Sequence, residues 1–248
     1  MRSDPAVGGQ TAVGGSPAAD PGASPPKARF RCEDTLEREL RVRGFAAVAG
    51  VDEVGRGALF GPVAAAAVVL CPSRPVHGLN DSKLLDPERR ETLARLIQER
   101  AAAWAVAAVD AATIDSINIY QASRLAMRLA VSRLNPPPDF LLVDAVAIDL
   151  PLPQQSLIKG DARCHAIAAA SIIAKVYRDA CMRVWDEAFP QYGLASHKGY
   201  ATREHLRALQ EFGPTPLHRL SFEPVRARSL FPLDYNPQMD LFATAGAA

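Results

Sequence analysis

The sequence has few cysteines and no long apolar run. Its 248 residues include four scattered cysteines, Cys32, Cys71, Cys164 and Cys181, with no C-x-x-C pair and no histidine at zinc-ligand spacing. No uninterrupted apolar run reaches the ~18 residues of a membrane-spanning helix, and the N-terminus lacks the basic-then-apolar order of a signal peptide. We therefore expect reduced cysteines in a cytosolic (cytoplasmic) protein that does not contact a membrane.

The chain also lacks a charge excess, because the formal net charge is only +1. No overall field attracts a polyanion, so any nucleic-acid surface must come from local clustering. Between residues 154 and 230 there are eleven Lys and Arg against seven Asp and Glu, an excess of four. Nothing in the sequence indicates an obligate subunit interface, and we expect a monomer.

Composition predicts one main domain between two tails. Residues 1–29 consist largely of Gly, Ala, Pro and Ser, which bury too little apolar area to offset the entropy of ordering, so we expect a disordered leader. Residues 233–248 again lose periodicity and are expected to form a flexible tail. The length between them, 30–232, suits a single core.

Hydrophobic periodicity in this central part predicts a mixed α/β fold. Apolar runs predict five strands, at 45–51, 63–70, 104–109, 140–144 and 154–158. Helical spacing predicts helices at 87–103, 114–134 and 166–189, with Asp86-Pro87 starting the first and Pro190 ending the last. We expect a mixed five-stranded sheet flanked by helices, followed by a helical C-terminal portion.

Four carboxylates stand at strand ends or in loops of this pattern. Asp52 and Glu53 follow the first strand, Asp144 ends the fourth, and Asp161 follows the Lys159-Gly160 turn. If the first and fourth strands pair, their acids meet at one edge of the sheet, where α/β folds usually bind ligands. A site with oxygen ligands alone favours Mg²⁺ or Mn²⁺ over zinc.

Two simpler interpretations remain open at this point. Arg56 can form an ion pair with the Asp52-Glu53 pair, without any metal. Gly55 and Gly57 can form only a tight turn between two strands, or they can let the backbone approach a ligand while Arg56 contacts a phosphate. Their spacing does not choose between these uses.

Seven segments together resemble ribonuclease HII, in the order expected for that family and over residues 47–225. They are 50–57 (GVDEVGRG) with 61–63 (GPV), 80–84 (NDSKL), 143–144 (VD), 159–162 (KGDA), 168–179 (AAASIIAKVYRD), 197–200 (HKGY) and 218–222 (HRLSF). The resemblance implies an RNase H-like fold, with residues 30–232 as the catalytic domain. It also implies an endonuclease that cuts the RNA strand of RNA–DNA hybrids and at ribonucleotides embedded in duplex DNA.

The resemblance also assigns roles to individual residues. Asp52, Glu53, Asp144 and Asp161 look like the family's catalytic metal ligands, for two-metal-ion hydrolysis with Mg²⁺ or Mn²⁺ that leaves 5′-phosphate and 3′-hydroxyl ends. The remaining matched residues look like substrate contacts: Gly55, Arg56 and Gly57 at the ribose 2′-hydroxyl, Tyr200 on the sugar beside the RNA–DNA junction, and Ser82 and Lys83 elsewhere. Asp179 is expected to support the site from its helix.

Related families offer alternatives. Ribonuclease HIII resembles this chain less, because it carries a folded N-terminal domain and lacks the arginine between the two glycines, whereas this chain has Arg56 after a low-complexity leader. Two other functions stay open: a DNA-junction nuclease with an RNase H fold, and a non-catalytic hybrid-binding module. The presence of all four carboxylates disfavours the second.

The C-terminal tail holds a separate short pattern. Residues 238–242 (QMDLF) resemble the peptide by which replication and repair proteins bind the DNA sliding clamp, with Gln238, Leu241 and Phe242 as the contacts. An apolar Leu-Phe pair on a tail has no core to enter, which is typical of anchor residues that fill a partner's pocket. The other interpretation is that the pair folds back onto the domain.

Overall fold

The computed structural model describes residues 32–228 and is built around one five-stranded sheet. Its strands are β1 (Val48–Val54), β2 (Val63–Val69), β3 (Ala103–Val109), β4 (Phe140–Asp144) and β5 (Gln154–Leu157). Their order is β3-β2-β1-β4-β5, with the first three strands antiparallel and β4 and β5 parallel to β1. The five predicted strands and the predicted pairing of the first with the fourth are confirmed.

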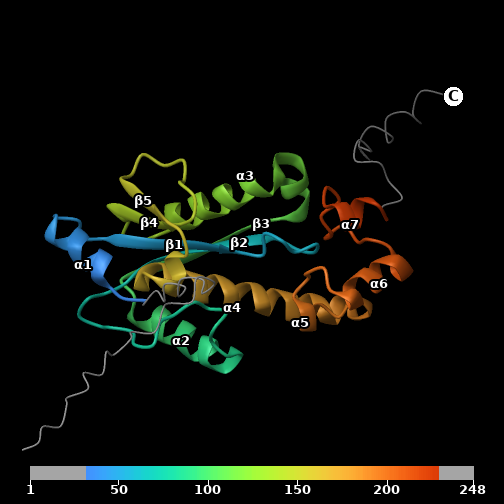
Figure 1. Cartoon of the computed structure of the whole chain (residues 1–248), viewed down its shortest axis with the longest axis horizontal. Coiled ribbons are helices and arrows are strands. Elements are labelled where there is room, and N and C mark those ends of the chain that lie inside the picture. The colour runs from blue at the N-terminus through green and yellow to red at the C-terminus, as the bar shows by residue number, and fades with distance from the viewer. Residues whose placement is uncertain (1–31, 229–248) are drawn as a thin grey trace, which may run out of the picture.

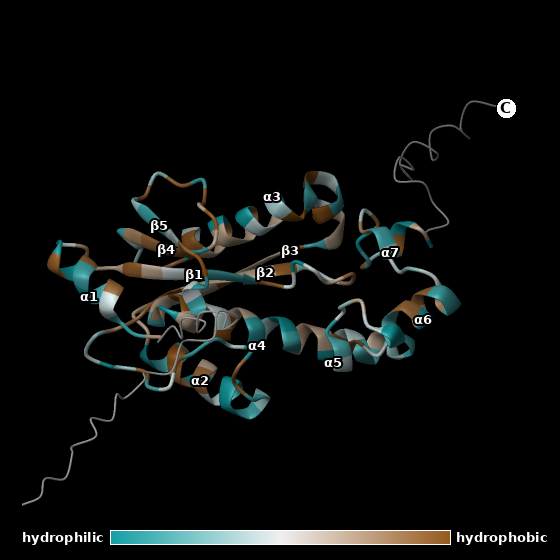
Figure 2. Ribbon diagram, viewed as in Figure 1, coloured by the Kyte–Doolittle hydropathy of each residue, from teal (hydrophilic) through white to brown (hydrophobic). Residues whose placement is uncertain are grey.

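Helices cover both faces of this sheet. Helix α3 (Ala111–Ser132) lies on one face, whereas α4 (His165–Ala188) lies on the other, with α2 (Pro87–Arg100) packed outside it (Figure 1). Figure 2 shows brown and teal alternating along α2, as expected for a helix with one buried side. The mixed α/β architecture is therefore the predicted one.

The C-terminal portion is helical, also as predicted. A short 3₁₀ helix, η2 (Pro190–Tyr192), leads into α5 (Leu194–His197), α6 (Arg203–Phe212) and α7 (Glu223–Arg226) at one end of the sheet (Figure 1). These elements enclose a small apolar cluster that includes Phe60 from the β1–β2 connection. The cluster therefore fixes that connection, residues 55–62, against the C-terminal helices.

Close contact between β1 and α4 depends on a glycine. A Cβ atom on Gly50 would lie 2.0 Å from the backbone carbon of Ala166, so only glycine lets α4 rest directly on the strand. Buried alanines continue this close packing on the same face of the sheet, including Ala66 on the neighbouring β2 and Ala169 and Ala170 on α4. Small side chains thus place α4 beside the end of β1 that carries Asp52.

Several local predictions needed correction. Strand β1 does not end at residue 51 but runs to Val54, because Asp52 and Glu53 pair with Ala66 and Ala65 of β2. Helix α3 begins three residues before the predicted start, since the Asp110 carboxylate accepts a hydrogen bond from Thr113 N–H (2.7 Å).

The predicted continuous helix at 114–134 is also interrupted, because Asn118 has a left-handed φ of 66°. Finally, α1 (Thr35–Val42) was not predicted. It packs Leu40 into a cluster with Phe140 and Leu142 of β4, a tertiary contact that local patterning does not reveal. None of the described helices has the length and apolar character needed to span a membrane. The predicted domain boundaries at residues 29 and 233 lie outside the described residues.

Candidate active site

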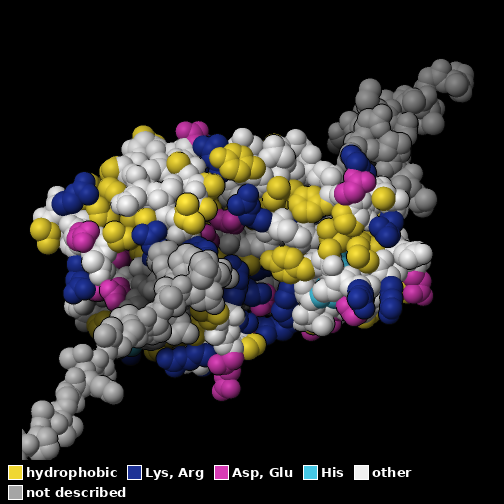
Figure 3. Space-filling view, viewed as in Figure 1, with side chains coloured by type: hydrophobic (Ala, Val, Ile, Leu, Met, Phe, Trp, Pro, Cys, Tyr) yellow, Lys and Arg dark blue, Asp and Glu magenta, His cyan; other side chains and the backbone are white. Residues whose placement is uncertain are grey.

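The predicted carboxylates lie around one cavity of about 440 Å³. Its lining consists of Asp52, Glu53, Val54, Ser82, Lys83, Asp144, Asp161, Ser171, Lys175 and Tyr200. Six segments of the chain therefore meet here: the end of β1, the loop before α2, the end of β4, the turn after β5, α4, and the segment between α5 and α6 that carries Tyr200. Lys and Arg side chains also gather across the middle of the face in Figure 3.

Parallel pairing of β1 with β4 brings the first acids together. Val51 pairs with Val143, so the next residue on each strand, Asp52 and Asp144, stands at the same edge of the sheet. Asp161 enters from η1 (Gly160–Ala162), whose first residue donates its N–H to Asp144 Oδ1 (2.7 Å). This backbone hydrogen bond orients the Asp144 carboxylate and links the two segments.

Glu53 lines the same cavity although it neighbours Asp52 on the strand. Its backbone N–H donates to Asp52 Oδ1 (2.7 Å), which ties the two residues together locally. Arg56 Nη1 lies 3.4 Å from Glu53 Oε1, so the ion pair considered as an alternative does exist. It involves Glu53 alone, however, and Arg56 shows no ion pair with Asp52, Asp144 or Asp161.

The electrostatics of the cavity are those of crowded carboxylates. Burial raises the pKa of Asp52 well above its ordinary value, and repulsion from Glu53 and Asp144 raises that pKa further. Burial likewise raises the pKa values of Glu53, Asp144 and Asp161. Such a cluster is unfavourable when ionised unless cations neutralise it.

The chemistry of this donor set fits hard divalent cations. Four carboxylates line the cavity, and neither His nor Cys does. Within residues 32–228, no three Asp, Glu, His or Cys side chains are grouped closely enough to enclose an ion by themselves. An open arrangement of carboxylates matches Mg²⁺, which keeps water and substrate oxygens among its ligands.

The segment Gly55-Arg56-Gly57 is not the two-residue turn that was one of its interpretations. The chain needs residues 55–62 to pass from β1 to β2, so this glycine pair only begins a longer connection. Gly55 has a φ of +87°, and a Cβ there would lie 2.2 Å from Arg178 Nε. A Cβ on Gly57 would come to 3.9 Å from the ring of Tyr200, which places these two predicted substrate contacts side by side.

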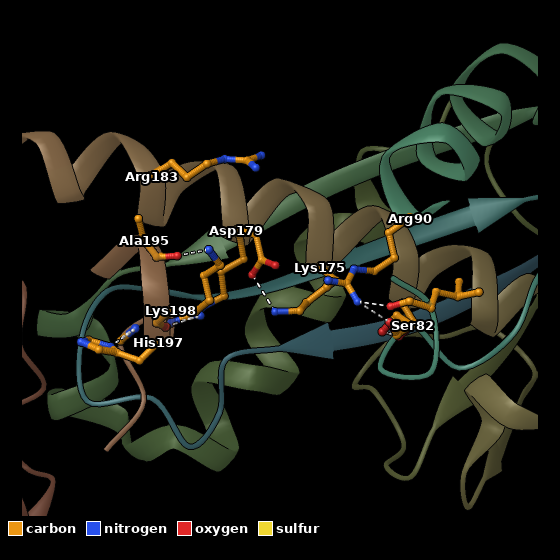
Figure 4. A network of polar contacts seen from close by, with 12 residues as sticks. Ser82, Arg90, Lys175, Asp179, Arg183, Ala195, His197 and Lys198 are labelled. Atoms are coloured by element: carbon orange, nitrogen blue, oxygen red, sulfur yellow. Dashed lines mark hydrogen bonds and ion pairs between the residues drawn. The ribbon is translucent and has the colours of Figure 1, made fainter. Parts of the chain in front are cut away.

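Ser82 and Lys83 also line the cavity, in different ways. The Ser82 hydroxyl is buried and lies 2.9 Å from the Ser171 hydroxyl of α4, so it joins the loop to the helix. Arg90 holds the same loop by donating to the carbonyls of Ser82 (2.8 Å) and Leu85 (2.6 Å) (Figure 4). Burial opposes ionisation of Lys83, but the attraction of Asp81 and Asp161 outweighs it and raises the Lys83 pKa.

Two polar lining residues, Ser171 and Lys175, were not predicted to belong to the site. Both stand one helical turn apart on α4, inside the quoted segment 168–179, so helical spacing from Asp179 was the available signal. Lys175 Nζ contacts Asp179 Oδ1 at 2.6 Å (Figure 4). Asp179 itself does not line the cavity, and its contact is with the lysine that does. The predicted clamp contacts Gln238, Leu241 and Phe242 lie outside the described residues.

This chain is similar to known proteins over most of its length. The family model for ribonuclease HII matches residues 49–225. The ribonuclease HII of Solibacter usitatus is 74% identical over 224 residues, which are 90% of this chain and 98% of that protein. The ribonuclease HII of Koribacter versatilis is 55% identical over 197 residues, 79% of this chain and 78% of that protein.

Solved structures share the fold. The RNase HII of the Archaeoglobus fulgidus PCNA:RNase HII complex aligns with a TM-score of 0.62 and 26% identity, over 71% of this chain and 95% of that one. Bst-RNase HIII in complex with Mn²⁺ aligns with a TM-score of 0.57 and 22% identity, over 73% of this chain and 68% of that one, a likeness of fold alone. With the sequence matches, these alignments lead to one conclusion: the chain belongs to the ribonuclease HII family, metal-dependent endonucleases that cleave RNA in RNA–DNA hybrids and at ribonucleotides embedded in DNA.

Proposed function

We propose that the cavity at the β1–β4 edge is the active site and that Asp52, Glu53, Asp144 and Asp161 hold Mg²⁺ or Mn²⁺ there. The observation that carries this proposal is the Val51–Val143 register, which puts two acids side by side in a cavity that two further acids also line. Divalent ions bound to such carboxylates supply an activated water, neutralise the attacked phosphate and help the leaving oxygen to depart. The products carry 5′-phosphate and 3′-hydroxyl ends.

The chain's own groups orient this site. Gly160 N–H holds Asp144, and the Ser171 hydroxyl hydrogen-bonds Asp52 and favours its ionised form. Lys83 and Lys175 line the same cavity and supply positive charge for the phosphates of the substrate strand. Ser82, expected to contact substrate, contributes by joining the Lys83 loop to α4.

We infer that the segment directly after the catalytic acids of β1, residues 55–57, selects for ribose. A 2′-hydroxyl is the local feature that distinguishes RNA from DNA, and it is read by hydrogen bonds. Gly55 and Gly57 have no side chain that would hinder the approach of a ligand to the backbone on either side of Arg56, and Tyr200, 37% exposed, presents a ring next to Gly57 for packing on a sugar. The catalytic acids and the ribose-reading segment are thus consecutive along the chain.

Cleavage of a DNA duplex that contains one ribonucleotide tests the proposal, with Mg²⁺ or Mn²⁺ present. We expect the wild type to cut this duplex and to leave an all-DNA duplex intact, and Asp52→Asn to lose activity by at least about a hundredfold. The matched control is Asp149→Asn, an exposed aspartate on the β4–β5 connection, which should cut normally. Cutting of the all-DNA duplex would favour a junction nuclease, and equal rates for Asp52→Asn and wild type would refute the metal assignment.

We also propose that Gln238, Leu241 and Phe242 bind the DNA sliding clamp. The support is the residue pattern at 238–242, together with the Archaeoglobus fulgidus relative, whose structure is a complex with PCNA. A pull-down with purified clamp tests this: Leu241→Ala/Phe242→Ala should lose retention while keeping nuclease activity. If the double variant and the wild type are retained equally, the tail is not the binding segment.

A further inference from the structure

Two arginines beside the active site are completely buried. Arg178 on α4 and Arg219 before α7 both have 0% exposure and are the largest of the fully buried side chains. Within residues 32–228, neither donates a hydrogen bond to an Asp or Glu side chain. Burial of a guanidinium destabilises a fold unless its N–H groups find hydrogen-bond acceptors, so the acceptors of these two arginines indicate what they do.

Arg178 joins the β1–β2 connection to the segment that carries Tyr200. Its Nη2 and Nε donate to the carbonyls of Phe60 (3.1 Å) and Pro62 (3.2 Å), while Nη1 donates to the carbonyl of Lys198 (2.9 Å). The guanidinium carbon lies 5.6 Å from the centre of the Tyr200 ring, within range of a cation–π contact. One side chain therefore touches both parts of the proposed ribose-reading surface.

Arg219 holds the same connection nearer to the two glycines. Its Nη1 donates to the carbonyl of Arg56 (2.8 Å), the residue between Gly55 and Gly57, and its Nε donates to the carbonyl of Gly61 (3.0 Å). Its backbone N–H donates to the carbonyl of Leu59 (2.8 Å). One guanidinium thus binds two carbonyls that are five positions apart in the connection, a reach that lysine does not reproduce with a single amine.

The connection needs such support because β1 ends at Val54 and β2 starts at Val63. Between them the carbonyls of Arg56, Phe60, Gly61 and Pro62 all accept from the two arginines. In return, Leu59 N–H donates to the carbonyl of Gly199 (2.8 Å), directly before Tyr200. Hydrogen bonds from charged donors are stronger than neutral ones, so this arrangement restricts a glycine-containing segment that is otherwise easily deformed.

We propose that Arg178 and Arg219 are positioning residues for ribose selectivity: they hold Gly55-Arg56-Gly57 and Tyr200 in one rigid unit so that the 2′-hydroxyl is read in a fixed geometry. This inference rests on the proposed function of that segment. Neither arginine lines the cavity, so neither is a catalytic residue.

The test compares Arg178→Lys and Arg219→Lys with the wild type on duplexes that carry one ribonucleotide or one 2′-fluoro nucleotide at the same position. Lysine keeps the charge but satisfies fewer carbonyls at once. The matched control is Met127→Ala, a fully buried residue of α3 on the opposite face of the sheet, which destabilises the core without touching the connection.

For each lysine variant we expect the ribose over 2′-fluoro ratio of kcat/KM to fall by about tenfold or more, through a lower kcat on the ribonucleotide, because misplaced hydrogen-bond donors lose transition-state contacts. Met127→Ala should keep the wild-type ratio. Hydrogen exchange at the Leu59 amide should also become faster in the lysine variants than in Met127→Ala.

Three other results would overturn part of the reasoning. Folded lysine variants that keep the wild-type ratio would refute the positioning role. If both lysine variants fail to fold, the arginines serve general stability and the proposal is equally refuted. If the wild type itself does not distinguish ribose from 2′-fluoro, the proposed function of residues 55–57 fails, whatever the arginines do.

Discussion

Lowering the pH from 7 to 5 is expected to destabilise the fold through two buried histidines, His205 and His218. Both are almost fully buried, and their Nε2 atoms lie 3.1 Å apart. His218 Nδ1 accepts from the Thr215 backbone N–H (2.9 Å), and His205 Nδ1 lies 3.0 Å from the carbonyl of Tyr200. The two rings therefore link the loop before α7 to the backbone of the proposed sugar-packing tyrosine.

The contacts determine where the protons sit. A carbonyl only accepts, so His205 Nδ1 carries a hydrogen and its Nε2 is the acceptor. His218 Nδ1 already accepts from Thr215, so its Nε2 carries the hydrogen and donates to His205. A further proton on either ring places two N–H groups face to face. Accordingly, burial lowers the pKa of His205 from 6.5 to about 4 and that of His218 to about 3.

The size of the effect follows from linkage. A group whose folded pKa is depressed contributes stability that is complete above the unfolded pKa, here 6.5, and that is lost as the pH falls toward the folded value. An unfolded histidine gains about 2 kcal/mol from protonation between pH 7 and pH 5, whereas a folded one with a pKa near 4 or below gains almost nothing. Together the two histidines should therefore lower the unfolding free energy by about 4 kcal/mol when the pH falls from 7 to 5.

Urea denaturation at pH 7 and pH 5 measures this loss. The carboxylates of the active site have raised pKa values and act in the opposite sense, so the informative quantity is the difference between variants. His205→Asn, which keeps a donor for the Tyr200 carbonyl, should lower the pH-dependent loss by about 2 kcal/mol. His77→Gln, at an exposed position, should leave it unchanged. Identical pH dependence in wild type and His205→Asn would refute the lowered pKa of His205.

Three further predictions concern packing, capping and metal. Gly50→Ala should lower the unfolding free energy by about 3 kcal/mol or more, since its Cβ would lie 2.0 Å from the Ala166 backbone. The control Gly44→Ala, strained only by its φ of +98°, should lower it by about 1 kcal/mol. Equal unfolding free energies for the two variants would contradict the close contact of α4 with β1. Glu37→Ala should lower the unfolding free energy by about 2 kcal/mol in urea denaturation, because Glu37 accepts from Ala166 N–H at 2.7 Å. The control, Glu39→Ala at an exposed position, should lower it by less than about 0.5 kcal/mol. A similarly small loss for Glu37→Ala would exclude Glu37 as the cap of α4. Chelation of divalent ions should abolish cleavage, Mg²⁺ or Mn²⁺ should restore it, and circular dichroism should not change; cleavage that survives chelation would refute a metal-dependent site.

Local signals predicted the elements well and their ends less well. The Asp86-Pro87 start of α2 was predicted because capping involves residues three apart, and the Asp86 carboxylate does accept from Arg89 N–H (2.8 Å). The end of β1 was misplaced because strand length depends on β2, whose residues Ala66 and Ala65 pair with Asp52 and Glu53 from 14 and 12 positions away. Local patterning contains no information on that register.

In the candidate site, too, local signals were predicted and non-local contacts were not. Its four acids were predicted because carboxylates at strand ends carry recognisable chemistry, and family resemblance supplied their roles. Ser171 and Lys175 were not assigned, since their direction on α4 depends on how that helix lies against β1. Arg178 and Arg219 resemble surface residues in the sequence, because nothing local reveals that backbone carbonyls of residues 56–62 surround them.

By itself, the sequence determined the types of the elements, an oxygen-only set of candidate ligands and membership of the ribonuclease HII family, because these depend on residue identity and short spacings. The tertiary structure alone decided that Asp52, Glu53, Asp144 and Asp161 line one cavity and that two buried arginines hold the connection between β1 and β2. The physical reason is that these contacts join residues dozens of positions apart. Strand register and the close packing of α4 on Gly50 set such distances, and neither is a local property of the chain.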